Sequence, residues 1–417
     1  MNTRLVFQSL VLLCALEVSS QKTMRISGQI VDQVTKEPLA FSTISIMGTP
    51  KGVVSNFLGS FEFSFSEEHT KDTLYFSMLG YQPKRIPINQ LKNGQGLDIQ
   101  LQESIVVLDE VSVSEKKLSA LDIVTKVIEE IPSNYPTEPY LLKGFTRSHK
   151  HECGQYLKLY EAAFEVYGGG YHKKTPEKIY INEARQSQEV PYYHSRVIRS
   201  NSNPFNAMGH INDVLFRSNS LKLNFNRYVI DKIIEEDGDL IYVIKTNHSA
   251  HVTHTMYIHA DSYALLKVKM EMGTPDSIDW NPLLNKGVSS DSLNFKVTRV
   301  SKTIQFEEKK GRYFAKYMDW LIAGDLTYKE TEEEFCEWGF RFETMFDEVI
   351  TQNVAKPSKD RLLNFRSVKE PQSTKYNPKF WEEYSLTKDF PITPQIISDL
   401  EKNGKLEEQY KEMARSK

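Results

Sequence analysis

The sequence is poor in cysteine, carries no strong excess of either charge, and has no long apolar run after its first residues. Its 417 residues include three Cys, 52 basic and 55 acidic residues, for a formal net charge of -3. Interspersed charges without a basic cluster exclude a nucleic-acid-binding function. A membrane-spanning helix needs about 20 consecutive apolar residues, so we expect no transmembrane segment in the mature chain.

The first 20 residues have the pattern of a signal peptide. Arg4 precedes a mostly apolar stretch from Leu5 to Leu16, and small residues precede Gln21. Gln8 and Glu17 interrupt the stretch, which argues against a membrane anchor. We expect cleavage after residue 20 and an exported protein that is periplasmic or associated with the outer membrane.

The three cysteines allow two modifications. Cys14 invites acylation, but Leu13 stands where a lipid-carrying cysteine is preceded by a small residue, so we expect no acylation. Cys153 and Cys336 remain after cleavage, and one disulfide is possible in an exported chain. Cys336 alternates with aromatic residues in EFCEWGFRF, and this apolar setting favours a buried free thiol.

Residues 24–102 contain short alternating runs separated by turn residues. Phe61, Phe63 and Phe65 alternate with polar residues, and two later runs, 74–78 and 97–101, do the same. Six or seven such strands predict a compact antiparallel sandwich.

This segment resembles the carboxypeptidase regulatory-like domain, a seven-stranded transthyretin-like sandwich. The resemblance is carried by Gly28 to Asp32 (GQIVD), Glu37-Pro38-Leu39, Gly48-Thr49, Lys51-Gly52, Gly59 with Phe61, and Gly80-Tyr81. It implies an envelope protein of gram-negative bacteria, and it implies turn-forming roles for the glycines.

A linker strand is expected at 103–116, followed by a β-rich α+β domain at 117–370. Leu121, Val124, Val127 and Ile131 recur at helical spacing after Ser119, a suitable N-cap with Asp122 three residues later. We expect this helix to stop at Ile131-Pro132.

Long strands follow, and two turns join neighbouring ones into hairpins. Asp237-Gly238 and Lys310-Gly311 supply the positive φ that tight turns need. Further strand candidates are Tyr156 to Val166, Lys178 to Gln188, Val252 to His259, Leu266 to Met272 and Phe335 to Phe346. Together they predict a large, curved antiparallel sheet.

Three helical or aromatic segments complete the chain. Asn203-Pro204 begins an expected helix with an apolar stripe of Phe205, Met208, Ile211 and Leu215. Residues 371–417 form an expected C-terminal clip and helix. The clip contains Phe380, Trp381 and Tyr384, and Thr393-Pro394 opens the last helix.

The second domain resembles envelope proteins with no assigned activity. The order IYVIKT, then MYIHADSYALLKV, resembles the half-barrel of periplasmic lipoprotein-carrier proteins. That resemblance implies a curved sheet that holds a helix and an acyl chain in its concavity. The expected fold is therefore mainly β: an N-terminal sandwich plus a larger, half-barrel-like sheet with a few packed helices.

Two histidine patterns raise the question of a metal. His149 to Glu152 (HKHE) has the His-x-x-Glu spacing of zinc carboxypeptidases, but about one such pair is expected by chance, and the α/β pattern of those enzymes is missing. Gly154 suits a hairpin turn, so HKHE is interpreted as a solvated hairpin tip.

The run NHSAHVTHTMYIH supplies His248, His251 and His254, which are candidate metal ligands if residues 247–250 form a turn. On one continuous strand they would alternate between faces, and solvated histidines are the preferred interpretation. We therefore assign no catalytic, cofactor or metal site and expect no cofactor.

Two functions remain. The first is a non-enzymatic module that binds an envelope lipid, glycan or protein. The second is a metal-dependent hydrolase acting on peptide or glycan, with the histidines as ligands. No local nucleophile motif of the G-x-S-x-G type supports an enzyme.

Overall fold

The structure is a computed structural model. It describes residues 22–104, 118–170, 177–190, 227–236, 238–249, 252–273, 293–331, 333–363, 375–384 and 390–415. The expected signal peptide with Cys14, most of the expected linker strand, the expected helix after Asn203, and His251 lie outside these residues. In the described part of the chain, no helix has the length and apolar character to cross a membrane.

The chain divides into two compact units. The sandwich unit contains residues up to Gln102 together with 389–391, and the sheet unit contains residues 103–388 and 392–417. Phe390 therefore packs with a unit almost 300 residues away in sequence. It is fully buried, and its ring stacks on that of Phe41 at 5.9 Å between centroids.

The sandwich unit has two sheets, whose strand orders are β4-β1-β7 and β3-β2-β5-β6. The strands are β1 (Thr23–Asp32), β2 (Thr43–Ile46), β3 (Gly52–Val54), β4 (Ser60–Ser66), β5 (Thr73–Ser77), β6 (Lys84–Pro87) and β7 (Gln95–Leu101), with 3₁₀ turns η1 (Glu67–Lys71) and η2 (Ile88–Gln90). The predicted seven-stranded sandwich is confirmed. The expectation that it is entirely antiparallel is wrong, because β1 and β7 pair in parallel.

The sandwich core follows from strand alternation. Phe61, Phe63 and Phe65 on β4 are at most 4% exposed, whereas Glu62 and Ser64 between them face solvent. Each predicted inward position thus contributes an aromatic ring to the space between the sheets.

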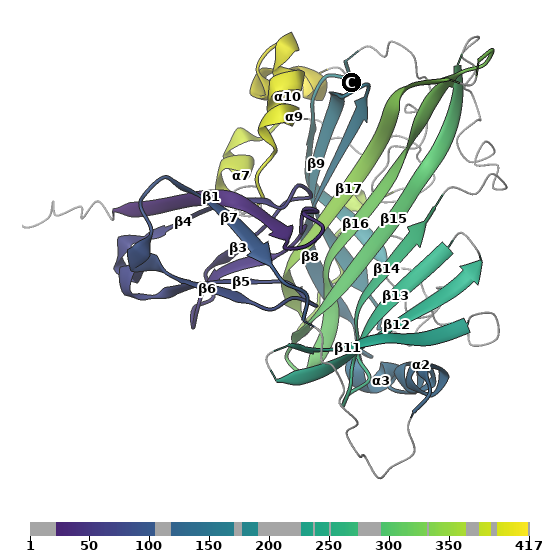
Figure 1. Ribbon diagram of the computed structural model, residues 1–417. Coiled ribbons are helices and arrows are strands. Elements are labelled where there is room, and N and C mark those ends of the chain that lie inside the picture. The colour runs from purple at the N-terminus through teal and green to yellow at the C-terminus, as the bar shows by residue number, and fades with distance from the viewer. Residues whose placement is uncertain are drawn as a thin grey trace, which may run out of the picture. The chain divides into compact units, whose positions relative to one another are not determined.

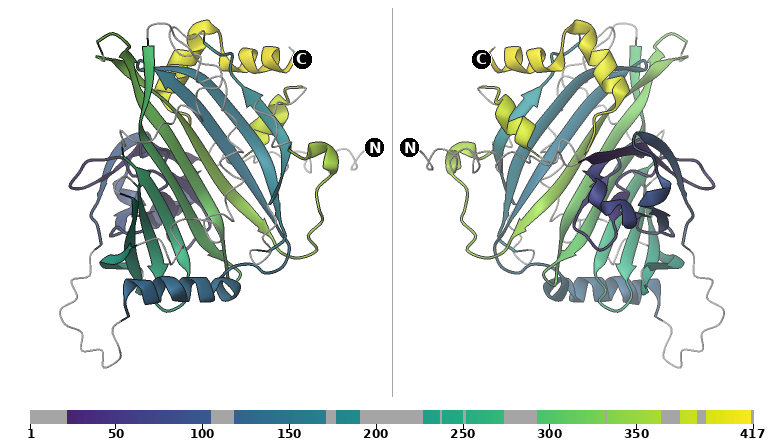
Figure 2. Two further views of the ribbon diagram at one scale, coloured as in Figure 1. Left: turned by 90° about the vertical axis from the view of Figure 1, so that its right-hand side faces the viewer. Right: turned by 90° about the vertical axis from the view of Figure 1, so that its left-hand side faces the viewer.

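The sheet unit is built on one open antiparallel sheet of ten strands, in the order β10-β9-β8-β17-β16-β15-β14-β13-β12-β11 (Figures 1 and 2). Its strands are β8 (Tyr140–Glu152), β9 (Gln155–Gly168), β10 (Lys178–Gln186), β11 (Arg227–Glu236), β12 (Asp239–Ser249), β13 (Val252–His259), β14 (Leu265–Met272), β15 (Leu293–Lys309), β16 (Arg312–Tyr328) and β17 (Glu334–Ile350). The mainly β fold with a large curved sheet is confirmed. We call it the large sheet.

The predicted strands and hairpins agree with these bounds. The turn between β15 and β16 has positive φ at Lys310 (56°) and Gly311 (75°), and Gly238 before β12 has φ of 95°. In mid-strand, Gly324 on β16 is required by close packing, because a Cβ there would lie 1.9 Å from the carbonyl oxygen of Lys296 on β15.

Helices lie around the large sheet. The capping box predicted from Ser119 and Asp122 is confirmed at the start of α2 (Ala120–Glu129). The helix ends at Glu129, two residues before the expected stop at Ile131. Pro132 instead lies in the first turn of the short helix α3 (Ile131–Asn134), where a missing N–H costs nothing. The other helical elements of the described residues are η5 (Lys359–Arg361), α7 (Pro378–Glu383), α9 (Pro394–Leu400), η6 (Glu401–Asn403) and α10 (Leu406–Arg415).

The large sheet has one apolar face. The first apolar cluster on it joins α2, through Ile123, Val124 and Val127, to residues of most of the strands. A second apolar cluster, centred on Trp338, Phe340 and Val300, lies farther along the same strands. Figure 2 shows α2 lying across one end of the strands.

Candidate functional site

The HKHE run ends β8, and a tight turn at Cys153 and Gly154 leads into β9. Both turn residues have positive φ, 50° and 74°, so the predicted hairpin is confirmed. The interpretation of HKHE as solvated is wrong. His149 is 2% exposed and Glu152 is 4% exposed. The reason is that β17 pairs with the other edge of β8, which makes β8 an interior strand.

His149 belongs to a row of charged side chains that crosses five strands on the polar face of the sheet. Register places Arg185 opposite Glu161, Glu161 opposite Arg147, Arg147 opposite Glu343, and Glu343 opposite Asp319. All five side chains point to one face because directly paired residues share a face. We call these residues, with His149 and Arg341, the charged row.

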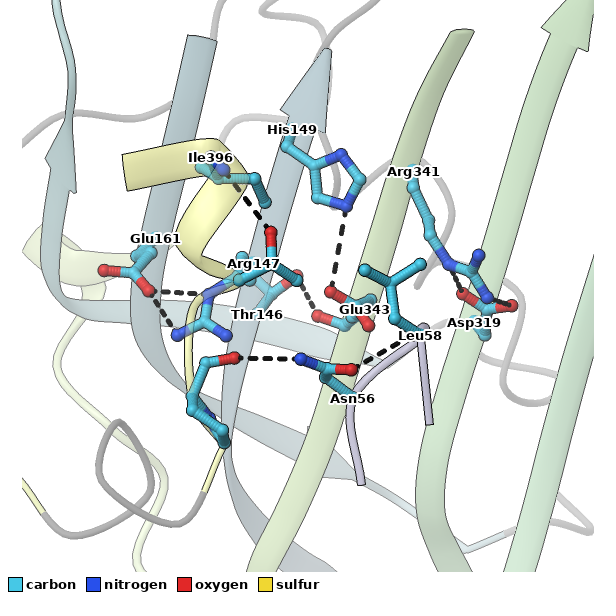
Figure 3. Close-up of polar contacts among 12 residues, drawn as sticks. Asn56, Leu58, Thr146, Arg147, His149, Glu161, Asp319, Arg341, Glu343 and Ile396 are labelled. Atoms are coloured by element: carbon cyan, nitrogen blue, oxygen red, sulfur yellow. Dashed lines mark hydrogen bonds and ion pairs between the residues drawn. The ribbon is translucent and has the colours of Figure 1, made fainter. Parts of the chain in front are cut away.

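The members of the charged row pair with one another (Figure 3). The Arg147 Nε donates to Glu161 Oε1 at 2.8 Å. Arg185, which the figure does not label, donates from its Nε to Glu161 Oε2 at 2.6 Å. Arg341 binds Asp319 in a bidentate pair at 2.7 and 2.8 Å. The charged row thus contains as many arginines as carboxylates, three of each. The hydrogen bonds between them join two charged groups, which is the geometry that a buried ion pair needs.

Electrostatics keeps His149 neutral. Burial, followed by the charges of Arg341 and Arg147 and by His151, lowers the pKa of His149 well below its usual value. Its Nε2 lies 3.9 Å from Glu343 Oε2, which is too long for a hydrogen bond. Burial raises the pKa of Glu161, but the charges of Arg185 and Arg147 outweigh it and hold that pKa below its usual value.

The C-terminal tail packs on one end of the charged row. The guanidinium of Arg185 lies 4.2 Å from the ring centroid of Trp381 and 4.9 Å from that of Tyr410. Asp399 accepts a hydrogen bond from the Tyr156 N–H at 3.0 Å. The charged row is therefore a structural ion-pair network. Its contacts with the aromatic rings of the C-terminal tail hold the tail against the sheet.

Cys153 and Cys336 form a disulfide with an S–S distance of 2.03 Å. The preference for a buried free thiol is therefore wrong. The alternating pattern of EFCEWGFRF correctly predicted that Cys336 lies on an apolar strand face, where it packs against the second apolar cluster. What it could not show is that the hairpin turn lies beside β17, where the Cys153 N–H donates to the Glu337 carbonyl at 2.9 Å.

The candidate metal ligands are described only in part. His254 lies on β13, 4% exposed and opposite Thr246 of β12. His248 lies at an irregular position of β12, between the paired residues Asn247 and Ser249. Within the described ranges, no group of three His, Cys, Asp or Glu side chains could hold a metal ion. Because His251 is outside them, the structure does not test whether His248, His251 and His254 could meet around a metal.

One Ser-His-Asp arrangement was not foreseen. The Ser262 Oγ lies 3.0 Å from His259 Nδ1, and His259 Nε2 lies 3.6 Å from Asp239 Oδ2. The backbone N–H of Ser262 also donates to His259 Nδ1 at 3.1 Å. The bonds between Ser262 and His259 are the side-chain bonding of a tight turn between β13 and β14. Asp239 lies outside that turn, at the start of β12, and its side chain is 65% exposed.

The sandwich unit has a shallow cleft of about 490 Å³. It is lined mainly by polar side chains, among them Gln33, Gln82, Arg85, Asp98 and Gln100. These five side chains are exposed, so the cleft lacks the apolar walls that bury most of a small ligand.

The apolar face of the large sheet also contains polar groups. A continuous register row crosses nine strands on this face, from β12 to β10: Thr246, His254, Met270, Lys302, Trp320, Phe342, Ser148, Tyr160 and Gln186. We call it the inner row. It separates the two apolar clusters, because Ile304 and Met318 on one side belong to the first, and Val300 and Ile322 on the other belong to the second.

Residues 26–113 match the model of the CarboxypepD_reg-like domain. The chain therefore contains a carboxypeptidase regulatory-like domain. The predicted resemblance of the first segment is confirmed by this match, which lies largely within the sandwich unit. No curated protein matches the sequence.

Several solved structures are similar to the chain at low identity. An outer-membrane lipoprotein-sorting protein domain from Vibrio parahaemolyticus is 11% identical, with 57% of this chain and 93% of that one covered and a TM-score of 0.26. A LolA superfamily protein from Nitrosomonas europaea is 9% identical, covering 57% and 96%, with a TM-score of 0.26. A DUF1329 family protein from Desulfovibrio piger is 10% identical, covering 57% and 93%, with a TM-score of 0.28. Scores this low support no inference of function.

Proposed function

We propose that the protein is an exported, non-enzymatic binding module of the cell envelope, and that its ligand is an amphiphile whose acyl part lies on the apolar face of the large sheet. The observation that carries the proposal is that face itself: two apolar clusters meet at the inner row. Small-molecule sites are mostly apolar and contain a few placed polar groups, which is the composition of this face.

Export is supported by the disulfide and by the first 20 residues. Disulfides persist in oxidising compartments such as the periplasm and are rare in the cytosol. The bond between Cys153 and Cys336 therefore suits a periplasmic or outer-membrane-associated protein. The signal-peptide pattern before Gln21 points the same way.

A binding role without turnover is supported by the state of the charged row. Perturbed titratable groups are candidates for catalysis, but ion-pair networks perturb them as well. Here Glu161 is shared by two arginines and Asp319 is held by Arg341, so these charges are accounted for by packing.

The test is to purify the protein from its own envelope and to analyse it by native mass spectrometry and lipid extraction. We expect a copurifying amphiphile. The variant Ile322→Glu places a charge in the second apolar cluster and should no longer copurify with the amphiphile. The control Val229→Glu changes a residue on β11 that is 60% exposed and should still copurify with it. Circular dichroism checks that both variants fold. The proposal fails if no lipid copurifies and added monooleoylglycerol does not bind.

A further inference from the structure

The cleft of the sandwich unit lies where three distant segments of the chain meet. The Gln33 N–H donates to the Leu101 carbonyl at 2.8 Å, and the Gln82 N–H donates to the Gln102 carbonyl at 2.8 Å. These backbone bonds bring the segment after β1 and the segment before β6 to the end of β7. Three glutamine side chains that are far apart in the sequence therefore line one cleft of about 490 Å³.

The amides of Gln33, Gln82 and Gln102 can bond to a ligand. Their side chains are exposed, and within the described part of the chain they have no hydrogen-bond partner. On β7, Asp98 and Gln100 continue the lining at every second position. The strand rises about 13 Å from Asp98 to Gln102, so the cleft is long enough for an extended ligand. Its volume lies within the range of about 300–1,000 Å³ that is usual for small-molecule sites.

The charged side chains that line the cleft are of both signs. Lys84 and Arg85 of β6 lie on it together with Asp98 of β7. The Arg85 guanidinium lies 5.1 Å from the centroid of the Tyr75 ring. All three charged side chains are exposed, so water and salt screen them and weaken any preference for a charged ligand. Hydrogen bonding therefore decides which ligand the cleft suits.

Glutamine amides suit a ligand that carries several hydroxyl groups. Each amide has two N–H donors and a carbonyl acceptor, and a hydroxyl group likewise donates and accepts. A carboxylate or a phosphate dianion only accepts, so it would leave the amide oxygens unmatched. An acyl chain would find no apolar wall in this cleft.

We propose that the cleft binds a neutral oligosaccharide through hydrogen bonds between its hydroxyl groups and the amides of Gln33, Gln82 and Gln102. This site goes beyond the proposed function, because the cleft belongs to the sandwich unit and the apolar face belongs to the sheet unit. Exposed hydrogen bonds compete with water, so we expect weak binding, with a Kd of about 1 mM.

The experiment titrates the full chain with β-linked trisaccharides and detects binding by saturation-transfer difference NMR, which suits weak ligands. Cellotriose and tri-N-acetylchitotriose are neutral. Triglucuronate is the anionic counterpart of cellotriose, and the glucosamine trimer is the cationic counterpart of tri-N-acetylchitotriose. We expect at least one neutral trisaccharide to bind, and its charged counterpart to bind less tightly.

The variant Gln82→Ala/Gln102→Ala removes two of the amides. It should weaken binding of the neutral trisaccharide at least about tenfold, since one hydrogen bond contributes a factor of about five. The bond between these two residues is made by the backbone, so the variant should keep it and fold normally. The matched control Gln90→Ala removes an exposed glutamine of the same unit that does not line the cleft, and it should bind as wild type does.

Three results would each refute the proposal: neither neutral trisaccharide gives a saturation-transfer signal at several millimolar, a charged counterpart binds more tightly than its neutral form, or the double variant binds as tightly as wild type. The amphiphile is tested separately, by copurification and by a variant of the large sheet. Failure of the oligosaccharide site therefore leaves the proposed function standing, and failure of the proposed function leaves this site standing.

Discussion

Breaking the disulfide should destabilise the sheet unit far more than the sandwich unit. The bond joins Cys153, in the β8–β9 turn, to Cys336 on β17, at a separation of 183 residues. In the chain-entropy model, a cross-link closing so long a loop removes about 5 kcal/mol of conformational freedom from the unfolded chain. The hydrogen bond from Cys153 to Glu337 remains in the reduced protein, so the folded structure loses little.

Urea unfolding monitored by tryptophan fluorescence measures this loss of stability in the sheet unit alone. All four Trp residues follow residue 102 in the sequence, so the signal reports the sheet unit. With an m-value of about 3 kcal/mol per M urea, a loss of 5 kcal/mol lowers the midpoint by about 1.7 M. We expect the variant Cys153→Ser/Cys336→Ser to show this shift.

The control is reduction of the wild type. Dithiothreitol should lower the wild-type midpoint to that of the double variant and leave the double variant unchanged. The reasoning is refuted if oxidised wild type, reduced wild type and double variant unfold at the same urea concentration, because the cross-link would then not constrain the unfolded chain.

Three further predictions concern the charged row and the sandwich. The pKa of His149 is lower in the folded protein than in the unfolded chain, so the unfolded chain binds the proton first as pH falls below about 6.5. The free energy of unfolding should therefore fall by up to about 1.4 kcal/mol per pH unit. The difference between the urea midpoints at pH 7.5 and pH 5.5 should be smaller in His149→Gln than in the wild type. Glu161→Gln leaves the buried Arg147 and the half-buried Arg185 without their carboxylate and should lower the free energy of unfolding by about 3–5 kcal/mol in the same tryptophan assay. An unchanged urea midpoint would contradict this. Phe390→Ala removes a buried ring from Phe41 and should destabilise the sandwich unit by about 3–5 kcal/mol, so its amides should exchange hydrogen faster while those of the sheet unit do not.

Helix starts and turns were predicted correctly from the sequence because each depends on residues that are neighbours in the chain. The capping box of Ser119 and the turn at Lys310-Gly311 each depend on residues within a few positions, and both were predicted. Alternation also assigned the faces of the strands, as with the phenylalanines of β4.

Pairing between distant strands was not predictable in this way. Nothing near Cys153 indicates that β17, almost 200 residues later, returns to lie beside β8. That one pairing buries His149, brings the two cysteines together and places Arg147 opposite Glu343. The wrong predictions about HKHE and the thiols both follow from this unseen pairing of β17 with β8.

The same pairing explains why the two faces of the large sheet have different roles. A charge on an interior strand must be matched from the strand beside it, and Glu161 is matched twice, by Arg147 and Arg185. The inner row occupies the opposite face at similar depth, yet Trp320 and Thr246 have buried polar atoms that the described residues do not match. The two faces therefore differ in chemistry: ion pairs between neighbouring strands stabilise the charged row, whereas apolar side chains make up most of the opposite face, to which the proposed function assigns the acyl part of the ligand.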